Sequence, residues 1–240
     1  GCVAGRGGAR VGAHAPRAAS PAGDEPPAPG YWKYVREVCD RHGVHLILDE
    51  VYCGLGRSGR SFCCEWDEVR PDFVTVGKTL AAGYVPLSAV ITTDAVADAI
   101  ADGPQGRVQH GHTHQGHSLG VAAALAVQKV VQTDEMLKRV EELGKRMRTS
   151  LRDGLGNHPY LRDIRGRGML FSIEYNCPKK NEFGTRIAEV LRAEGNILLN
   201  AKWHRMSFAP PFILTDNEAE RMTEAVVRAL HATADGWTEC

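Results

Sequence analysis

The stretch "LILDEVYCGLGRSG" at residues 46–59 places an apolar, strand-like run directly before two acidic residues and a glycine-rich loop. Apolar residues recur at helical spacing from Tyr31 and stop at Gly43, which predicts a helix that leads into this buried strand. Two further apolar runs, "DFVTV" at 72–76 and "PLSAVI" at 86–91, have the length of core strands. Helices that alternate with short buried strands predict a largely parallel α/β sheet.

The composition narrows the classes of partner. The 240 residues carry 29 basic and 29 acidic side chains and no net charge, so we expect neither a nucleic acid nor a membrane surface as partner. The longest strongly apolar stretch, at 119–127, is too short to span a bilayer. Seven cysteines lack the paired spacing of a disulfide framework or a zinc ribbon, which indicates reduced thiols in a cytoplasmic protein.

The chain divides by composition and pattern into three parts. Residues 1–29 form a leader rich in Ala, Gly, Arg and Pro, which we expect to be flexible because it has too few large apolar groups to offset ordering entropy. Its arginines suggest a transit peptide, although its glycines and prolines oppose the amphipathic helix that such a peptide needs. We expect a larger α/β domain over 30–154, including a connector helix capped by Thr133, and a smaller α+β domain over 155–240. The smaller domain's expected elements are strands at 160–164 and 169–175, a helix near 182–194, and a last helix with a capping box at Thr215.

Two side chains at strand ends have the chemistry of a reactive site. Lys78 follows the strand run "FVTVG", and a lysine desolvated at such a place offers an uncharged amine that attacks carbonyl groups. Asp49 ends the preceding strand, and ligands of open α/β sheets bind outside the carboxyl ends of the strands. Pyridoxal 5'-phosphate (PLP) needs both a lysine and an acid that keeps its ring nitrogen protonated. The alternatives are a lysine that only extends to solvent and an aspartate that only bonds to a loop or caps a helix.

Five blocks, in this order and spacing, resemble the class III PLP-dependent aminotransferases of PLP fold type I. They are "LILDEVYCGLGRSG" (46–59), "PDFVTVGKTLAAGYVPLSAV" (71–90), "HGHTHQGHSLGVAAALAV" (110–127), "IRGRGMLFSIEY" (164–175) and "FAPPFILTDNEAERM" (208–222). The resemblance runs from about Tyr31 to Ala234 and corresponds to the C-terminal half of the family's chain. It implies an α/β PLP-transferase fold, with part of the mixed sheet of the large, PLP-binding domain and a small C-terminal α+β domain.

The resemblance also implies roles for four residues. Asp49 would pair with the pyridinium nitrogen of PLP, and Val51 would pack on one face of the ring. Lys78 would form the Schiff base with the cofactor and later carry a proton during the reaction. Thr113 matches the threonine that reaches the cofactor phosphate of the neighbouring subunit, so a homodimer is expected.

Two departures from the family pattern affect the expected substrate and partner. Many members that act on α-amino acids have an arginine two residues before "APP", where this chain has Ser207, with Arg205 two residues further back. The serine favours an amine, an ω-amino acid or another kind of substrate, unless Arg205 or another group binds the substrate carboxylate. The first half of the family's chain, which supplies the phosphate-binding turn and a ring-stacking aromatic, has no counterpart in these residues.

We therefore expect an aminotransferase that moves an amino group from an amine or amino acid to a keto acid, as one half of a split enzyme that needs a partner chain. The alternatives are a non-catalytic relic or accessory subunit of a full-length aminotransferase, and another PLP reaction such as that of an aminomutase, decarboxylase or epimerase.

Weaker signals suggest no second chemistry. His110, His112, His114 and His117 alternate in a loop without an evident carboxylate or cysteine set, so no metal site is expected. Glu50 is expected to bond to backbone or to another subunit. The pair "CC" at 63–64 is expected to be buried thiol.

Overall fold

The computed structural model describes residues 13–15, 26–177, 179–195, 197–202, 204–235 and 237. Its contacts divide the chain into two compact units. The first unit includes Pro27–Gly56 and Arg60–Leu137, and the second includes Arg57–Gly59 and the described residues from Lys138 onward. This division falls earlier in the chain than the domain boundary expected after residue 154, because most of the expected connector helix belongs to the second unit.

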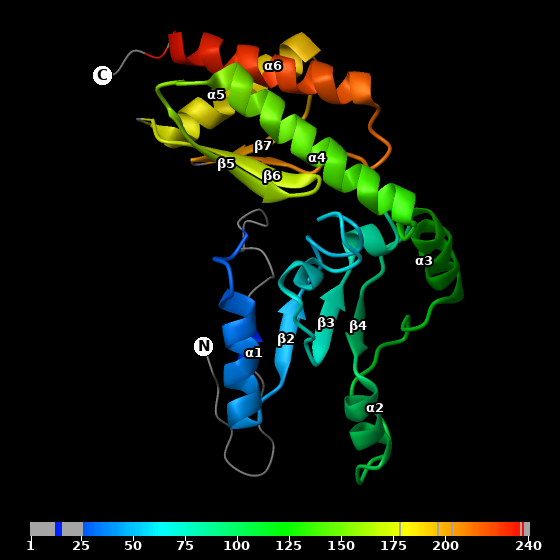
Figure 1. The fold of residues 1–240 in the computed structure, drawn as a ribbon. Coiled ribbons are helices and arrows are strands. Elements are labelled where there is room, and N and C mark those ends of the chain that lie inside the picture. The colour runs from blue at the N-terminus through cyan, green and yellow to red at the C-terminus, as the bar shows by residue number, and fades with distance from the viewer. Residues whose placement is uncertain are drawn as a thin grey trace. The chain divides into compact units, whose positions relative to one another are not determined.

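A four-stranded sheet lies at the centre of the first unit. Its strands are β1 (Ala13–Ala15), β2 (Leu46–Asp49), β3 (Phe73–Val76) and β4 (Ala89–Thr92), in that spatial order. The first three strands run parallel. The strand β4 runs antiparallel to β3, and Figure 1 shows β2, β3 and β4 side by side. The sheet is therefore mixed. Two of the predicted strands, β2 and β3, lie at its centre, whereas the third, β4, lies at its edge and is not the core strand that its apolar run suggested.

The strand β1 lies inside the leader that was expected to be flexible over 1–29. Ala13–Ala15 pairs in parallel with Leu46–Leu48 of β2. Pairing of this kind uses backbone N–H and C=O groups and needs no large side chains, so an alanine-rich segment carries no hydrophobic signal for it. The leader residues on either side, 1–12 and 16–25, are outside the described residues.

The helix α1 (Tyr31–His42) leads into β2 as predicted. Its buried side chains include Trp32 and Cys39, which lie seven residues apart on one helical face. Gly43 ends the helix in the left-handed conformation, with φ of 57°, and donates its N–H to the carbonyl group of Asp40. This sharp exit directs the chain into a strand in which Leu46 and Leu48 are completely buried.

Two further α-helices and two short 3₁₀ helices complete the described part of the first unit. They are η1 (Cys63–Asp67), η2 (Lys78–Leu80), α2 (Asp94–Ala101) and α3 (Ser118–Val131). Unlike β2, the strand β4 is exposed at all four residues. No helix in the described part of the chain has the length and apolar character to cross a membrane.

The second unit packs three helices with an antiparallel sheet. The helices are α4 (Asp134–Leu155), α5 (Lys180–Gly195) and α6 (Asp216–Asp235). The strands are β5 (Leu161–Arg167), β6 (Leu170–Tyr175), β7 (Asn200–Lys202) and β8 (Arg205–Phe208), in the spatial order β5-β6-β8-β7. Figure 1 shows the helices gathered along one face of this sheet. Phe171 and Phe208 stack with ring centroids 4.6 Å apart in its buried core.

The predicted helix starts in this part of the chain are confirmed. Thr133 accepts a hydrogen bond on its hydroxyl from the N–H of Met136 at 3.2 Å, which caps α4. Before α6, the N–H of Glu218 donates to the Thr215 hydroxyl at 3.2 Å, and the N–H of Thr215 donates to the Glu218 carboxylate at 2.8 Å. This reciprocal pair is the predicted capping box.

Candidate functional site

The carboxyl ends of the parallel strands β2 and β3 bring the two predicted reactive residues to one edge of the sheet. Asp49 is the last residue of β2, and it lies in register with Thr75 of β3. Lys78 follows β3 after one intervening glycine and starts η2. The acid and the amine therefore leave neighbouring strands at the edge where open α/β sheets bind ligands.

Two donors fix the carboxylate of Asp49. Its Oδ1 accepts from the N–H of Val51 at 3.1 Å and from the hydroxyl of Thr75 at 3.1 Å. Both donors lie in the same unit, and the aspartate is half-buried. A carboxylate held in this way keeps its orientation and can face a cationic ligand group without reorganising. The contribution of Thr75 was missed from the sequence, because it depends on the register between two strands.

The backbone of Lys78 has an uncommon conformation. Its φ is +44°, in the left-handed region that few residues other than glycine adopt. Such conformations collect at functional sites, where the surrounding structure imposes them. The Lys78 side chain is exposed, and its Nζ lies 5.1 Å from the centroid of the Tyr52 ring. The amine is therefore not desolvated, contrary to what its place after a core strand had suggested, and it is available to a ligand. It has one aromatic neighbour that was not predicted.

Close packing joins Val51 to the segment before Lys78. A Cβ atom at Gly77 would lie 3.3 Å from Cγ1 of Val51, so these two positions are nearly in contact. Thr113 lies on an exposed turn of the same unit, ahead of α3. Asp49, Val51, Lys78 and Thr113 are therefore all carried by the first unit, whereas Arg205 and Ser207 belong to the second.

Arg205 and Ser207 share one face of β8, since residues two apart on a strand point the same way. Arg205 is in register with Glu174 of β6, and Ser207 is in register with Ser172. Glu174 is buried, and it pairs with Arg162 at 3.0 Å and also with Arg165. Arg205 therefore lies opposite a buried carboxylate that two other arginines already pair with.

Glu50 supports the loop that carries the site. Its side chain is only 1% exposed, and its carboxylate accepts the N–H groups of Cys63 at 2.6 Å and Cys64 at 2.8 Å. The expectation that Glu50 bonds to backbone is confirmed, as is the burial of both thiols. Burial raises the pKa of Glu50, while the two N–H donors act in the opposite direction. The residue is thus a structural neighbour of Asp49 that ties the loop to η1.

We expect Glu50→Ala to lower the free energy of unfolding by about 2 kcal/mol, because it leaves two buried N–H groups without an acceptor. Urea unfolding followed by circular dichroism measures the loss. The matched control is Glu65→Ala on η1, which removes an exposed carboxylate that accepts one backbone N–H, from Phe62, at 3.1 Å. Water can replace that acceptor, so we expect a loss of roughly 0.5 kcal/mol. Equal losses in the two variants would contradict this account of Glu50.

One histidine of the histidine-rich loop caps a helix. His117 accepts the N–H of Gly120 on Nδ1 at 3.3 Å and so caps α3. Its ring lies 6.4 Å from that of His114. Within the described ranges, no group of three or more His, Cys, Asp or Glu residues is arranged to hold a metal ion.

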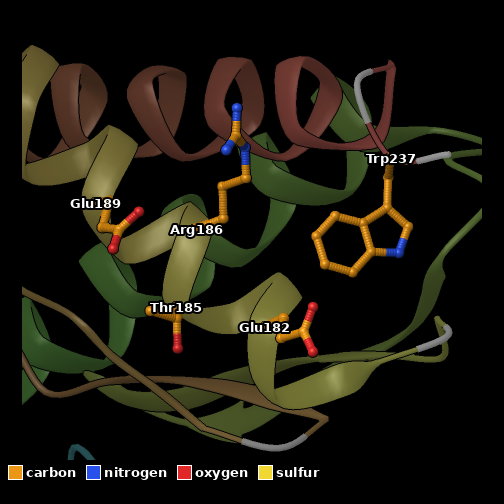
Figure 2. Close-up of a pocket in the computed structure, with 5 residues that line it drawn as sticks. All are labelled: Glu182, Thr185, Arg186, Glu189 and Trp237. Carbon is orange, nitrogen blue, oxygen red and sulfur yellow. The ribbon is translucent and has the colours of Figure 1, made fainter.

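A hollow of about 370 Å³ opens on the second unit. Figure 2 shows its lining, which comes from one face of α5 and from Trp237 near the C-terminus. The lining residues are Glu182, Thr185, Arg186, Glu189 and Trp237. None of the predicted site residues is among them.

The residues at the edge of the first sheet fit two ends of PLP. A carboxylate held by two donors suits a protonated ring nitrogen, and an exposed amine suits an aldehyde carbon. Both come from adjacent parallel strands, as one small ring would require. Asp49 and Lys78 thus fit the ring nitrogen and the aldehyde carbon of PLP. Other groups would have to bind its phosphate.

The sequence matches known proteins along most of its length. Residues 16–230 match the family model described as aminotransferase class-III. An aminotransferase from Gibberella zeae is 43% identical over 157 residues, which are 65% of this chain and 30% of the relative. Ornithine aminotransferase 2 of Staphylococcus aureus is 35% identical over 205 residues, which are 85% of this chain and 49% of the relative. The chain thus spans about half the length of these relatives, or less.

A solved structure agrees with the fold. The ornithine aminotransferase of Toxoplasma gondii, whose active site was found partly occupied by PLP, superposes with a TM-score of 0.83 at 33% identity. The match covers 93% of this chain and 51% of that one. This agreement confirms the predicted α/β fold class and the expectation that the chain corresponds to about half of such a protein.

Proposed function

Since the chain belongs to the class-III aminotransferase family, which is PLP-dependent, we propose that it takes part in moving an amino group from an amine or amino acid to a keto acid. The observation that carries this proposal is the placement of Asp49 and Lys78 at the carboxyl ends of two adjacent parallel strands. The fixed carboxylate and the exposed amine are the two groups that PLP chemistry requires of a protein.

Each residue near this edge has a proposed task. When bound, PLP would supply an electron sink for the bonds that break. The carboxylate of Asp49 would keep the ring nitrogen protonated, and Val51 would orient the ring by packing on one face. Lys78 would bind the cofactor through its amine and then move a proton as a general acid and base. Thr113 would reach the phosphate of the site on a neighbouring subunit, which makes a dimer part of the proposal.

The donor that we propose is an ω-amino compound. Ser207 stands where many relatives that act on α-amino acids have an arginine, so this position lacks a cation for an α-carboxylate. Two relatives are ornithine aminotransferases, and ornithine carries a terminal amine. Arg205, on the same face of β8, is the nearest candidate in that strand for a carboxylate at the far end of such a donor.

We further propose that the remaining half of the family fold, on a partner chain, covers an apolar surface of the first unit. Val90 of β4 is 65% exposed and Leu119 of α3 is 65% exposed, and Leu125 and Val130 of the same helix are also exposed. Large apolar side chains exposed in this number are a common feature of interfaces, which supports a covered surface here. The free cysteines of the described residues are buried, which suits a cytoplasmic location for the assembly.

Capture of the cofactor tests the proposal. The chain is co-expressed with the N-terminal half of a class-III relative, and the purified complex is treated with PLP and borohydride. Peptide mass spectrometry should find the reduced cofactor on Lys78. A complex that forms but takes up no PLP would contradict the enzymatic role and favour a non-catalytic accessory subunit. If the cofactor is held but no amino group moves, an aminomutase, decarboxylase or epimerase reaction becomes the better assignment.

A further inference from the structure

An aromatic residue lies beside the amine of Lys78. Tyr52 lies in the loop that follows β2, three residues after Asp49, and its ring is half-buried. The Nζ atom of Lys78 is 5.1 Å from the centroid of this ring. A lysine ammonium within about 6 Å of an aromatic centroid is attracted by the negative face of the ring.

The position of the Tyr52 ring is set by the loop around it. The N–H of Gly54 donates to the carbonyl group of Glu50 at 3.0 Å and closes a turn with Tyr52 at its centre. A Cβ atom at Gly54 would lie 2.8 Å from that carbonyl oxygen, so the turn is tightly closed. On one side of Tyr52 the N–H of Val51 is bonded to Asp49, and on the other Cys53 is buried. The ring therefore projects from a rigid support.

The Lys78 side chain, in contrast, is exposed and has a long flexible stem. Its backbone is fixed by η2, where the N–H of Ala81 donates to the carbonyl group of Lys78 at 3.3 Å. The stem between this backbone and the amine has four rotatable bonds, and restricting them costs up to about 2 kcal/mol of entropy. An attractive ring on a rigid turn offsets part of this cost before any ligand arrives.

We propose that Tyr52 is a positioning residue that holds the charged amine of Lys78 at the sheet edge shared with Asp49. This inference rests on the proposed function in one respect, namely that Lys78 is the amine that binds the cofactor. The contact with the ring competes with attack on a carbonyl group, because the amine must leave the ring before it can react. Tyr52 thus sets how readily Lys78 reacts.

Competitive acetylation of the whole chain tests this proposal without any cofactor. The chain is treated with a trace of acetic anhydride over a range of pH, and mass spectrometry gives the labelling of Lys78 relative to exposed Lys129 on α3. At neutral pH, Tyr52→Leu should raise this ratio about two- to five-fold, since a surface cation–π contact is worth about 0.5–1 kcal/mol. At strongly alkaline pH the two chains should label alike, because the ring does not attract a neutral amine.

Tyr52→Phe is the matched control, because it keeps the ring and removes only the hydroxyl. It should label as the wild type does at every pH. If circular dichroism shows that Tyr52→Leu does not fold, Tyr52→Gln, which also lacks a ring, takes its place. An unchanged ratio in the ringless variant, or an equal rise in Tyr52→Phe, overturns the proposal.

The test separates this inference from the proposed function. Labelling that responds to loss of the ring, combined with no PLP capture on Lys78 in the assembled complex, leaves the role of Tyr52 intact and removes the enzymatic role. If Lys78 captures PLP but its labelling does not change when the ring is removed, the enzymatic role stands and the role of Tyr52 is removed.

Discussion

Lys78→Ala is expected to abolish amino-group transfer by the assembled complex, with a fall in turnover of at least about 10³-fold. The variant removes the group that would bind the cofactor and the group that would move the proton, and proton transfer by a positioned side chain alone contributes about 10²–10⁴-fold. The measurement is the formation of the amino acid product from an ω-amine donor and a keto acid, at saturating PLP. Complex formation should be unaffected, because Lys78 is an exposed residue at a strand end.

Two matched variants define what the loss means. Lys78→Arg keeps a cation near the Tyr52 ring but has no nucleophilic amine, so it should be as inactive as the alanine variant. Lys129→Ala removes an exposed lysine from α3 in the same unit and should retain full activity. Residual turnover of Lys78→Ala within ten-fold of the wild type would rule out the proposed role. If the complex keeps its activity when this chain carries Lys78→Ala, the chain is instead an accessory subunit.

The core strands and the reactive ends could be predicted because they depend on local patterns. Leu46 and Leu48 form an apolar run of strand length, and both are completely buried. Asp49 then had to lie at the carboxyl end of that strand, where a parallel sheet binds its ligands. The sequence order alone thus placed the acid and the amine at one edge.

The support of the site could not be predicted in the same way. The bond from Thr75 to Asp49 depends on the register between β2 and β3, and the contact between Tyr52 and Lys78 depends on side-chain rotamers. The strand β1 was missed because alanines pair through their backbone without a hydrophobic pattern. The expected domain boundary differed because a helix pattern says nothing about which unit the helix packs on.

A single methyl group on α4 is expected to have the largest effect on stability. Gly144 lies in the middle of this helix and is buried. A Cβ atom there would lie 1.8 Å from the carbonyl oxygen of Gly168, in the turn between β5 and β6. The same oxygen accepts a hydrogen bond from Arg148 at 2.6 Å, so the helix and the turn are held together at this point. Neither partner can relieve the overlap by rotating a side chain, because both atoms are fixed by backbone.

Gly144→Ala should therefore lower the free energy of unfolding by at least about 3 kcal/mol. Alanine favours a helix over glycine by about 1 kcal/mol, but overpacking against backbone costs more than this gain. Gly120→Ala in α3 is the same substitution in a helix, and its nearest neighbour, Cδ1 of Leu87, is 3.7 Å away. That variant should be neutral or up to ~1 kcal/mol more stable. Urea unfolding of both variants gives the comparison, and a Gly144→Ala chain as stable as Gly120→Ala would show that α4 does not depend on this close approach.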